Sequence, residues 1–134
     1  MDKYVIYVDG AYSSSRNMMG YAFVVLKNGE KVYSYFMNEK DGTNNRAEVR
    51  AAIEACKWAV GEGYDEITVY SDSMYVIGTM TQNWKRKKNV DLWIAMDDIA
   101  EKIKVNWIHV KGHNGDRYNE LCDVLATQAS QVVD

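Results

Sequence analysis

The chain has 134 residues, with no proline and two cysteines. This length suits a single catalytic or binding domain over residues 1–134, and a composition of 47% hydrophobic and 26% charged residues excludes a disordered or fibrous protein. No apolar run approaches the roughly 20 residues that cross a membrane, no signal peptide is apparent, and two cysteines are too few for a disulfide scaffold. We therefore expect a cytoplasmic protein without a membrane partner.

The net charge of −3 alone argues against nucleic acid as a partner, because proteins that bind polyanions are usually basic. The average conceals one basic run, Lys85-Arg86-Lys87-Lys88, and several acids that interrupt apolar patterns. If four of these acids held two divalent cations, the net charge would become positive. An acidic chain that acts on nucleic acid is therefore compatible with this composition.

The N-terminal part of the chain predicts three strands. Residues 3–12 are rich in Val, Ile and Tyr, and apolar runs at residues 20–27 and 31–38 follow them. Asn28-Gly29, between the second and third runs, is a strong signal for a hairpin turn. We expect these three strands to form an antiparallel meander.

The rest of the chain alternates helices with strands. Helical periodicity covers residues 44–60, after which Gly61 and Gly63 should end the helix. Short strands are expected at residues 67–70 and 105–110. Further helices are expected at residues 73–82, 90–103 and 117–131, with Asp116 as the cap of the last one. The order β-β-β-α-β-α-α-β-α predicts an α/β fold with a mixed five-stranded sheet and helices packed on it.

Four acids stand out because they interrupt apolar patterns. Asp9 ends the apolar run of the first strand, and Glu48 lies on the face of its helix that carries Ala52, Ala55, Cys56 and Ala59. Asp72 follows a strand directly, and Asp123 flanks the apolar stripe of the last helix. A buried charge is costly unless a partner compensates it. Four hard oxygen donors would together suit Mg²⁺ or Mn²⁺ better than zinc.

Each of these acids also has an ordinary explanation when it is taken alone. Asp9 could be a turn acid at a strand end, and Glu48 could interact with the N-terminus of its helix. An N-cap would fully explain Asp72, and a solvated helix face would explain Asp123. The two histidines are also ambiguous. His113 lies in a glycine-bounded loop, where histidines are usually exposed bystanders, and His109 should be half-buried in the last strand.

Five segments, residues 7–11, 43–48, 70–73, 111–115 and 119–123, occur in this order along nearly the whole chain, and together they resemble ribonuclease H type 1. The segment from Thr43 to Glu48 and the segments from Lys111 to Asp123 are the most specific of them. The segments are Tyr7-Val8-Asp9-Gly10-Ala11, Thr43-Asn44-Asn45-Arg46-Ala47-Glu48, Tyr70-Ser71-Asp72-Ser73, Lys111-Gly112-His113-Asn114-Gly115 and Asn119-Glu120-Leu121-Cys122-Asp123. The ribonuclease H-like fold of that family has the element order expected here.

The resemblance implies an endonuclease that hydrolyses the RNA strand of RNA–DNA hybrids and leaves 5′-phosphate and 3′-hydroxyl ends. It implies a catalytic, metal-binding set of Asp9, Glu48, Asp72 and Asp123 that holds two Mg²⁺ ions, with Mn²⁺ as a substitute. In two-metal catalysis one ion activates the attacking water and the other stabilises the leaving oxygen. His113 matches the loop histidine that assists proton transfer or product release.

The resemblance also implies contacts with the hybrid. These fall on Gly10, Thr43, Asn44, Asn45, Met74 and Asn89. Many members carry a long basic helix and loop that is reduced here to residues 83–88. We interpret Trp84, Lys85, Arg86, Lys87 and Lys88 as a shortened hybrid-binding handle, with a solvated basic loop as the alternative.

Two other functions are compatible with the same scaffold. One is a non-catalytic module that binds hybrids, which the loss of any one of the four acids would favour. The other is a nuclease of similar fold that acts on DNA alone, against which the segment from Thr43 to Arg46 argues. We expect no obligate protein partner, and a monomer is the simplest expectation.

Overall fold

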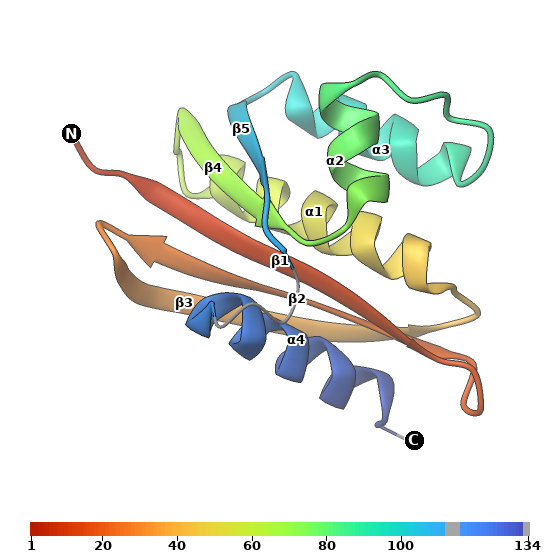
Figure 1. The fold of residues 1–134 in the computed structure, drawn as a ribbon. Coiled ribbons are helices and arrows are strands. Elements are labelled where there is room, and N and C mark those ends of the chain that lie inside the picture. Colours follow the sequence, from red (N-terminus) through yellow and green to blue (C-terminus); the bar gives the residue numbers. More distant parts are fainter. Residues whose placement is uncertain (112–115, 133–134) are drawn as a thin grey trace.

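The computed structural model describes residues 1–111 and 116–132 (Figure 1). Within them, one five-stranded sheet has the order β3-β2-β1-β4-β5. Its strands are β1 Tyr4–Ser13, β2 Met18–Lys27, β3 Glu30–Lys40, β4 Glu66–Ser71 and β5 Lys104–His109. β1, β2 and β3 form an antiparallel meander, whereas β4 is parallel to β1 and β5 is parallel to β4. The predicted mixed sheet is confirmed.

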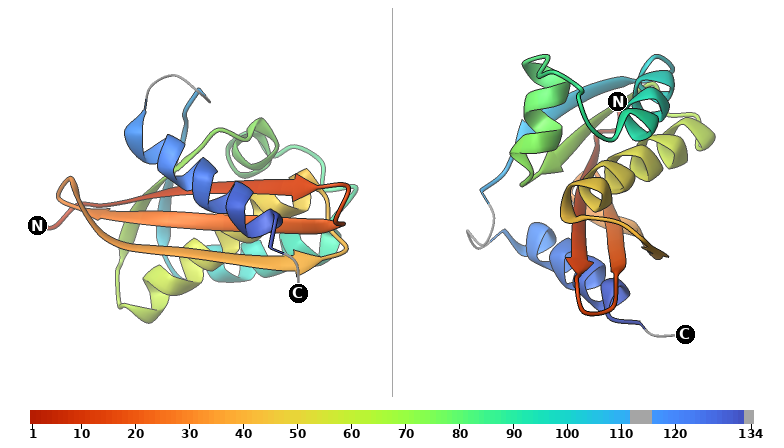
Figure 2. Two further views of the ribbon diagram at one scale, coloured as in Figure 1. Left: turned by 90° about the horizontal axis from the view of Figure 1, so that it is seen from below. Right: turned by 90° about the vertical axis from the view of Figure 1, so that its right-hand side faces the viewer.

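Helices cover both faces of this sheet (Figure 2). They are α1 Asn44–Gly61, α2 Met74–Thr81, α3 Val90–Ala100 and α4 Arg117–Ser130. α1 packs on the face of β1 that carries Ile6 and Val8, and α3 packs against α1 in turn. α4 packs on the opposite face, against Val5 and Tyr7. The alternation of side chains along β1 therefore divides the core into two layers. None of the described helices is both long and apolar enough to cross a membrane.

Capping side chains begin three of the described helices, and the caps of α4 and α2 bear on the sequence predictions. Asp116 caps α4 as predicted, because its Oδ1 accepts hydrogen bonds from the backbone N–H groups of Tyr118 and Asn119. The cap of α2 is Ser73, whose hydroxyl accepts from the backbone N–H of Val76 at 3.2 Å. The ordinary explanation of Asp72 as an N-cap is therefore wrong, and capping does not account for a carboxylate at this position.

Three further expectations are wrong. The helix expected at residues 90–103 ends at Ala100, because Ile103, which continued the apolar period, is buried from a turn that leads into β5. Asp9 does not end a strand, since β1 continues to Ser13 and Asp9 pairs with Ala22 of β2. His109 is exposed rather than half-buried, because β5 lies at the edge of the sheet.

Gly20 of β2 allows the close approach of α4. A Cβ atom at this position would lie 2.1 Å from the carbonyl oxygen of Ala126 and 2.5 Å from the amide nitrogen of Ser130. Both are backbone atoms, so a side-chain rotation cannot relieve the contact. The close packing of α4 on the sheet therefore depends on Gly20.

We predict that Gly20→Ala lowers the free energy of unfolding by about 1–3 kcal/mol, as overpacking does in well-packed cores. The matched control is Gly61→Ala at the end of α1, where an added Cβ meets no atom within 4 Å among the described residues. That change should raise stability by up to about 1 kcal/mol, because alanine favours the helix. Urea denaturation of both variants measures the difference, and an equal effect would contradict the close packing of α4.

Candidate active site

Asp9 and Asp72 lie side by side because β1 and β4 are parallel and in register. The last paired residues are Val8 of β1 and Ser71 of β4, and the residue that follows each of them in the chain is an aspartate. β1 continues beyond this point and β4 does not, which leaves a step in the sheet at the carboxyl end of β4. Such strand ends are where α/β sheets usually place ligand sites. Asp9 is only 3% exposed at this step, and Asp72 is half-buried.

Glu48 reaches the same position from the first turns of α1. Thr43 caps the start of α1, accepting a hydrogen bond from the backbone N–H of Arg46 at 3.1 Å. Glu48 is only 6% exposed, and the buried residues beside it on the helix are apolar. The Glu48 carboxylate is therefore shielded from solvent.

Gly10 joins the strand to the helix at this point. Its backbone N–H donates to Oε1 of Glu48 at 2.6 Å and to Oδ1 of Asp9 at 2.9 Å. A Cβ atom on Gly10 would lie 2.4 Å from backbone atoms of Ala47 and Glu48, so only glycine allows this approach. A glycine inside a strand was the available signal for close packing, and the sequence analysis assigned Gly10 only to substrate contact.

Three carboxylates converge as a result. One oxygen from each of Asp9, Glu48 and Asp72 lies within 4.8 Å of the other two. Burial raises the pKa of Asp9 to about 8, with further contributions from the negative charges of Asp72 and Asp123. Burial and the charges of Asp9 and Asp72 likewise raise the pKa of Glu48 well above its usual range. The apo cluster is therefore electrostatically unfavourable when fully ionised.

The cluster has the properties of a cation site. Oδ2 of Asp9 is buried without a hydrogen-bond partner among the residues that the structure describes. An unpartnered buried oxygen beside two further carboxylates is the arrangement that a bound cation would satisfy. Carboxylate oxygens are hard ligands suited to divalent ions such as Mg²⁺ and Mn²⁺. The residues present therefore fit a divalent metal ion.

Asp123 lies apart from these three oxygens and is half-buried on α4. The preceding residue, Cys122, holds this part of α4 to the sheet, because its thiol donates to the carbonyl oxygens of Tyr7 and Ala22 at 3.5 and 3.3 Å. The Asp123 charge contributes to the raised pKa of Asp9, which places Asp123 within electrostatic range of the cluster. The structure thus brings three of the four acids together and sets the fourth beside them.

A second contact, which the sequence analysis missed, positions the start of α4. The Tyr7 hydroxyl donates to Oδ2 of Asp116 at 3.0 Å, while the other oxygen of Asp116 caps the helix. Tyr7 lies two residues before Asp9 on the same strand. The contact therefore ties the helix that carries Asp123 to the strand that carries Asp9. His113 lies outside the described residues.

Most of the residues expected to contact substrate are exposed near the cluster. Thr43, Asn44 and Asn45 form the exposed start of α1, and Met74 at the start of α2 is 41% exposed. Asn89 is half-buried, where its amide donates to the Tyr75 hydroxyl at 3.0 Å. Thr43, Asn44 and Asn45 precede Glu48 on the chain by three to five residues, and Met74 follows Asp72 by two.

Arg46 links two of these segments. Its guanidinium donates to both carboxylate oxygens of Asp91 at 3.0 and 2.8 Å, and to Oδ1 of Asn89 at 3.2 Å. This pairing holds the pKa of the exposed Asp91 carboxyl at about 2. Arg46 therefore fixes the start of α3 to the start of α1.

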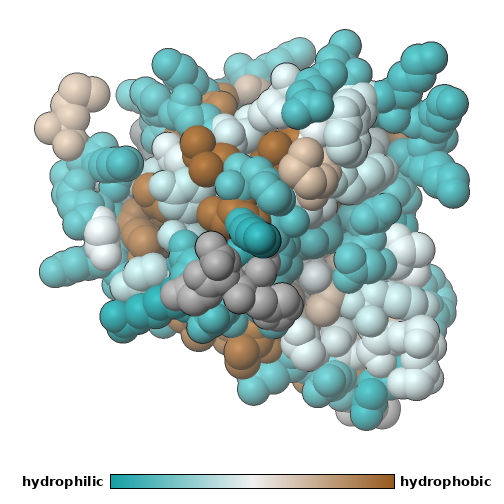
Figure 3. All heavy atoms as spheres, viewed as in Figure 1, coloured by the Kyte–Doolittle hydropathy of each residue, from teal (hydrophilic) through white to brown (hydrophobic). Residues whose placement is uncertain are grey.

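The basic run between α2 and α3 has two kinds of member. Lys85, Lys87 and Lys88 are exposed, and Figure 3 shows hydrophilic side chains projecting where this connection lies. Arg86 instead lies against α3, with its guanidinium 3.1 Å from the carboxylate of Asp97 and 5.7 Å from the centre of the Trp93 ring. Arg86 therefore anchors the connection, and the lysines are available to a ligand.

Trp84 is held in a defined position although it is 42% exposed. Its ring lies over Gly78 of α2, where an added Cβ would come within 2.5 Å of the indole. Its indole N–H donates to the side chain of Gln82 at 3.2 Å. One side of the indole ring is therefore packed against α2, and the rest of the ring faces solvent beside the lysines.

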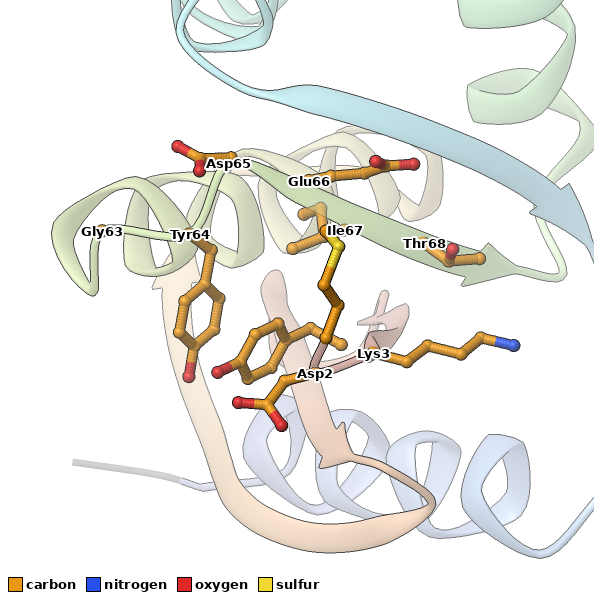
Figure 4. Close-up of a pocket in the computed structure, with 10 residues that line it drawn as sticks. Asp2, Lys3, Gly63, Tyr64, Asp65, Glu66, Ile67 and Thr68 are labelled. Atoms are coloured by element: carbon orange, nitrogen blue, oxygen red, sulfur yellow. The ribbon is translucent and has the colours of Figure 1, made fainter.

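A pocket of about 570 Å³ lies at the other end of β1 and β4, around the stacked rings of Tyr4 and Tyr64 (Figure 4). Its lining residues come from the start of the chain, from the turn that precedes β4 and from the first residues of β4. None of the cluster carboxylates is among them. The pocket is therefore separate from the candidate active site.

Comparisons with known proteins show the family to which the chain belongs. A profile of the RNase H family matches residues 1–131. Ribonuclease H of Acetivibrio thermocellus is 40% identical over 142 residues, covering 95% of this chain and 94% of the relative. Ribonuclease H of Syntrophomonas wolfei is 42% identical over 143 residues, covering 96% and 97%.

Among solved structures, the N-terminal RNase H domain of a Mycobacterium tuberculosis protein matches with a TM-score of 0.85 and 27% identity, covering 97% of this chain and 94% of that chain. This chain therefore belongs to the RNase H family, and the family predicted from its motifs is confirmed.

We predict that Asp9→Asn stabilises the metal-free protein at pH 8. Folding raises the pKa of Asp9 from 3.8 to about 8. Asp9 therefore does not lower the free energy of unfolding below about pH 4, where it is protonated in both states. The free energy of unfolding then falls as the pH rises through about 8, because the unfolded state ionises more readily. The variant should gain at least about 1 kcal/mol at pH 8, and the gain should shrink as the pH falls toward 4.

Urea denaturation in the presence of a chelator measures this gain. The matched control is Asp65→Asn, which removes an exposed carboxylate just before β4 and should change stability little at either pH. A gain that does not depend on pH, or an equal gain in the control, would contradict the proposed repulsion within the cluster.

Proposed function

We propose that this protein is a metal-dependent endonuclease that hydrolyses the RNA strand of RNA–DNA hybrids and leaves 5′-phosphate and 3′-hydroxyl ends. The observation that carries the proposal is the convergence of Asp9, Glu48 and Asp72 in a chain of the RNase H family. A non-catalytic binding module is not favoured, because it would have no need to keep these mutually repelling acids buried together. Residues 1–134 would act as one catalytic domain.

Asp9, Glu48, Asp72 and Asp123 would hold the metal, for which we propose two Mg²⁺ ions with Mn²⁺ as a substitute. Bound there, the ions would supply an activated water and neutralise the charge that develops on the reacting phosphate. The chain itself orients the ligands. The Gly10 N–H directs Glu48 and Asp9, and the step between β1 and β4 sets Asp72 beside Asp9. We assign proton transfer or product release to His113.

Recognition of the hybrid would use the exposed polar side chains at the start of α1. Thr43, Asn44 and Asn45 lie next to Glu48 in the sequence and are exposed, so a duplex on the cluster would contact them. Such contacts read backbone, sugar and groove shape rather than base edges, and they favour RNA where they meet a 2′-hydroxyl. We therefore expect little sequence preference.

The proposed cellular location rests on the state of the two cysteines and not on a targeting motif. Cys56 and Cys122 are both buried and free, as expected for a protein of a reducing compartment. We propose the cytoplasm on that ground.

We predict that the protein cleaves the RNA strand of a labelled RNA–DNA hybrid in Mg²⁺ and leaves duplex DNA and duplex RNA intact. Asp9→Asn should lower the cleavage rate by at least about 100-fold, since it removes one central ligand. Asp65→Asn, just before β4 and at the end of that strand away from the cluster, should cleave at the normal rate. Binding without cleavage would favour the non-catalytic module, and equal cleavage of duplex DNA would favour a DNA nuclease.

The exposed lysines should contribute a salt-dependent part of hybrid affinity. Replacing Lys85, Lys87 and Lys88 with alanine should weaken binding and reduce the slope of log K against log salt by about one unit per lysine that contacts a phosphate. Fluorescence anisotropy at several salt concentrations measures the slope.

Two controls separate this effect from a change in net charge or in folding. Removal of Lys3, Lys57 and Lys102, exposed at other parts of the surface, should leave the slope nearly unchanged. Arg86→Ala should mainly lower stability, because it breaks the contact with Asp97. An unaltered slope in the lysine variant would support the solvated-loop alternative.

A further inference from the structure

Tyr7 is a residue with a polar group at a core position of β1. It packs on the face of the sheet that α4 covers, where the buried residues around it are apolar, and it is only 7% exposed. A buried hydroxyl costs stability unless it has a hydrogen-bond partner. The partner here is Oδ2 of Asp116, which lies 3.0 Å away and 109 residues further along the chain. A phenylalanine would fill the same space, so this contact is what the hydroxyl adds.

Asp116 uses its two carboxylate oxygens for two different contacts. Oδ1 caps α4 by accepting from the backbone N–H groups of Tyr118 and Asn119, and Oδ2 accepts from the Tyr7 hydroxyl. A serine would cap the helix as well, but it has no second oxygen to accept from Tyr7. The carboxylate therefore joins the first turn of α4 to β1, which a cap alone does not do.

Tyr7 contacts α4 at a second point as well. Its backbone carbonyl oxygen accepts from the thiol of Cys122 at 3.5 Å, six residues after Asp116. At about 1.5 Å of rise per residue, the two contacts lie roughly 9 Å apart along the helix. Asp123 follows Cys122 directly, and its spacing of seven residues from Asp116 is close to two full turns, so these two acids lie on nearly the same side of α4. Figure 2 shows α4 lying along this face of the sheet.

The later part of α4 is held by contacts that do not involve Tyr7. Because Gly20 has no side chain, the helix backbone packs closely on β2 at Ala126 and Ser130. This packing does not depend on the Tyr7 hydroxyl. Removing the hydroxyl should therefore loosen the first two turns of α4, which lead to Asp123, while the rest of the helix stays on the sheet.

We propose that Tyr7 and Asp116 are positioning residues that set Asp123 in place beside the carboxylate cluster. The inference rests on the proposed function, because it concerns Asp123 as a metal ligand. Asp123 is half-buried and lies apart from the three oxygens that converge, so its contribution to a bound ion depends on how α4 is placed on β1. Tyr7 precedes Asp9 by two residues on β1. The contact therefore fixes the helix of one ligand to the strand of another.

Metal affinity of the intact protein, measured without substrate, tests this role. Tyr7→Phe keeps the ring and removes the hydroxyl, whereas Asp116→Ser keeps a capping oxygen and removes the second one. Each should weaken Mn²⁺ binding in calorimetric titration by about 10-fold or more, as the loss of a group that orients metal ligands usually does. The combined variant should lose no more than either single variant, because both changes remove the same contact.

Asp116→Asn separates the position of the side chain from its charge. Its side-chain oxygen can still cap α4, and its amide can donate to the Tyr7 hydroxyl oxygen, so the contact survives with donor and acceptor exchanged. Mn²⁺ affinity should therefore stay close to that of the unchanged protein. If the negative charge of Asp116 were the cause, Asp116→Asn would weaken binding as much as Asp116→Ser.

Two further comparisons separate positioning from general stability. In the Asp123→Asn background, Tyr7→Phe should cause no further loss of Mn²⁺ affinity, because it acts through the Asp123 carboxylate. The matched control is Ile67→Val in the core layer on the opposite face of the sheet. That change lowers stability by the loss of one buried methyl group and should leave Mn²⁺ affinity unchanged.

The outcomes distinguish this inference from the proposed function. An unchanged protein that binds no Mn²⁺ and cleaves no hybrid overturns both. If the unchanged protein binds Mn²⁺ and cleaves the hybrid, but Tyr7→Phe and Asp116→Ser bind Mn²⁺ as tightly, only the positioning role is overturned. An equal loss in Ile67→Val, or a further loss in the Asp123→Asn background, also overturns it. Should Tyr7→Phe fold poorly, the contrast between Asp116→Ser and Asp116→Asn decides.

Discussion

The mutual repulsion of three clustered carboxylates, two buried and one half-buried, is the constraint on which the rest of the structure depends. Oxygens of Asp9, Glu48 and Asp72 lie within 4.8 Å of one another where little solvent can screen them. Burial and this proximity raise the pKa of Asp9 and of Glu48. Such an arrangement needs a rigid scaffold while it is empty and gains stability from a bound cation. The Gly10 N–H donates to two of the three carboxylates and offsets part of their charge.

Each of the three acids is held by a different element of the scaffold. The parallel pairing of β1 with β4 sets Asp72 beside Asp9, and the close contact at Gly10 brings α1 and Glu48 to the same place. On the other face, the contact of Tyr7 with Asp116 ties α4 to β1. The site therefore lies where the antiparallel half of the sheet meets its parallel half. The β3 edge of the sheet is separated from the site by β2.

Local patterns predicted most of the fold, and long-range contacts explain what they missed. Hairpin signals, helical periodicity and the Asp116 cap are properties of neighbouring residues, so those elements were recognisable. Ile103 continued the helical period from a turn, and the exposure of His109 depends on the strand order. The acids were recognisable as candidates because they interrupt apolar patterns. Their convergence depends on the register of β1 with β4, and the contact of Tyr7 with Asp116 joins residues that no local pattern relates.

The most direct test of the central claim is calorimetric titration of the protein with Mg²⁺ or Mn²⁺ in buffers of different ionisation enthalpy. If buried, partly protonated carboxylates bind the ion, binding at pH 7 must displace protons, because the pKa of Asp9 is about 8 before the ion binds. We expect proton release at pH 7 that declines as the pH rises above 8. Binding without proton release at pH 7, or no binding at the cluster, would contradict the account.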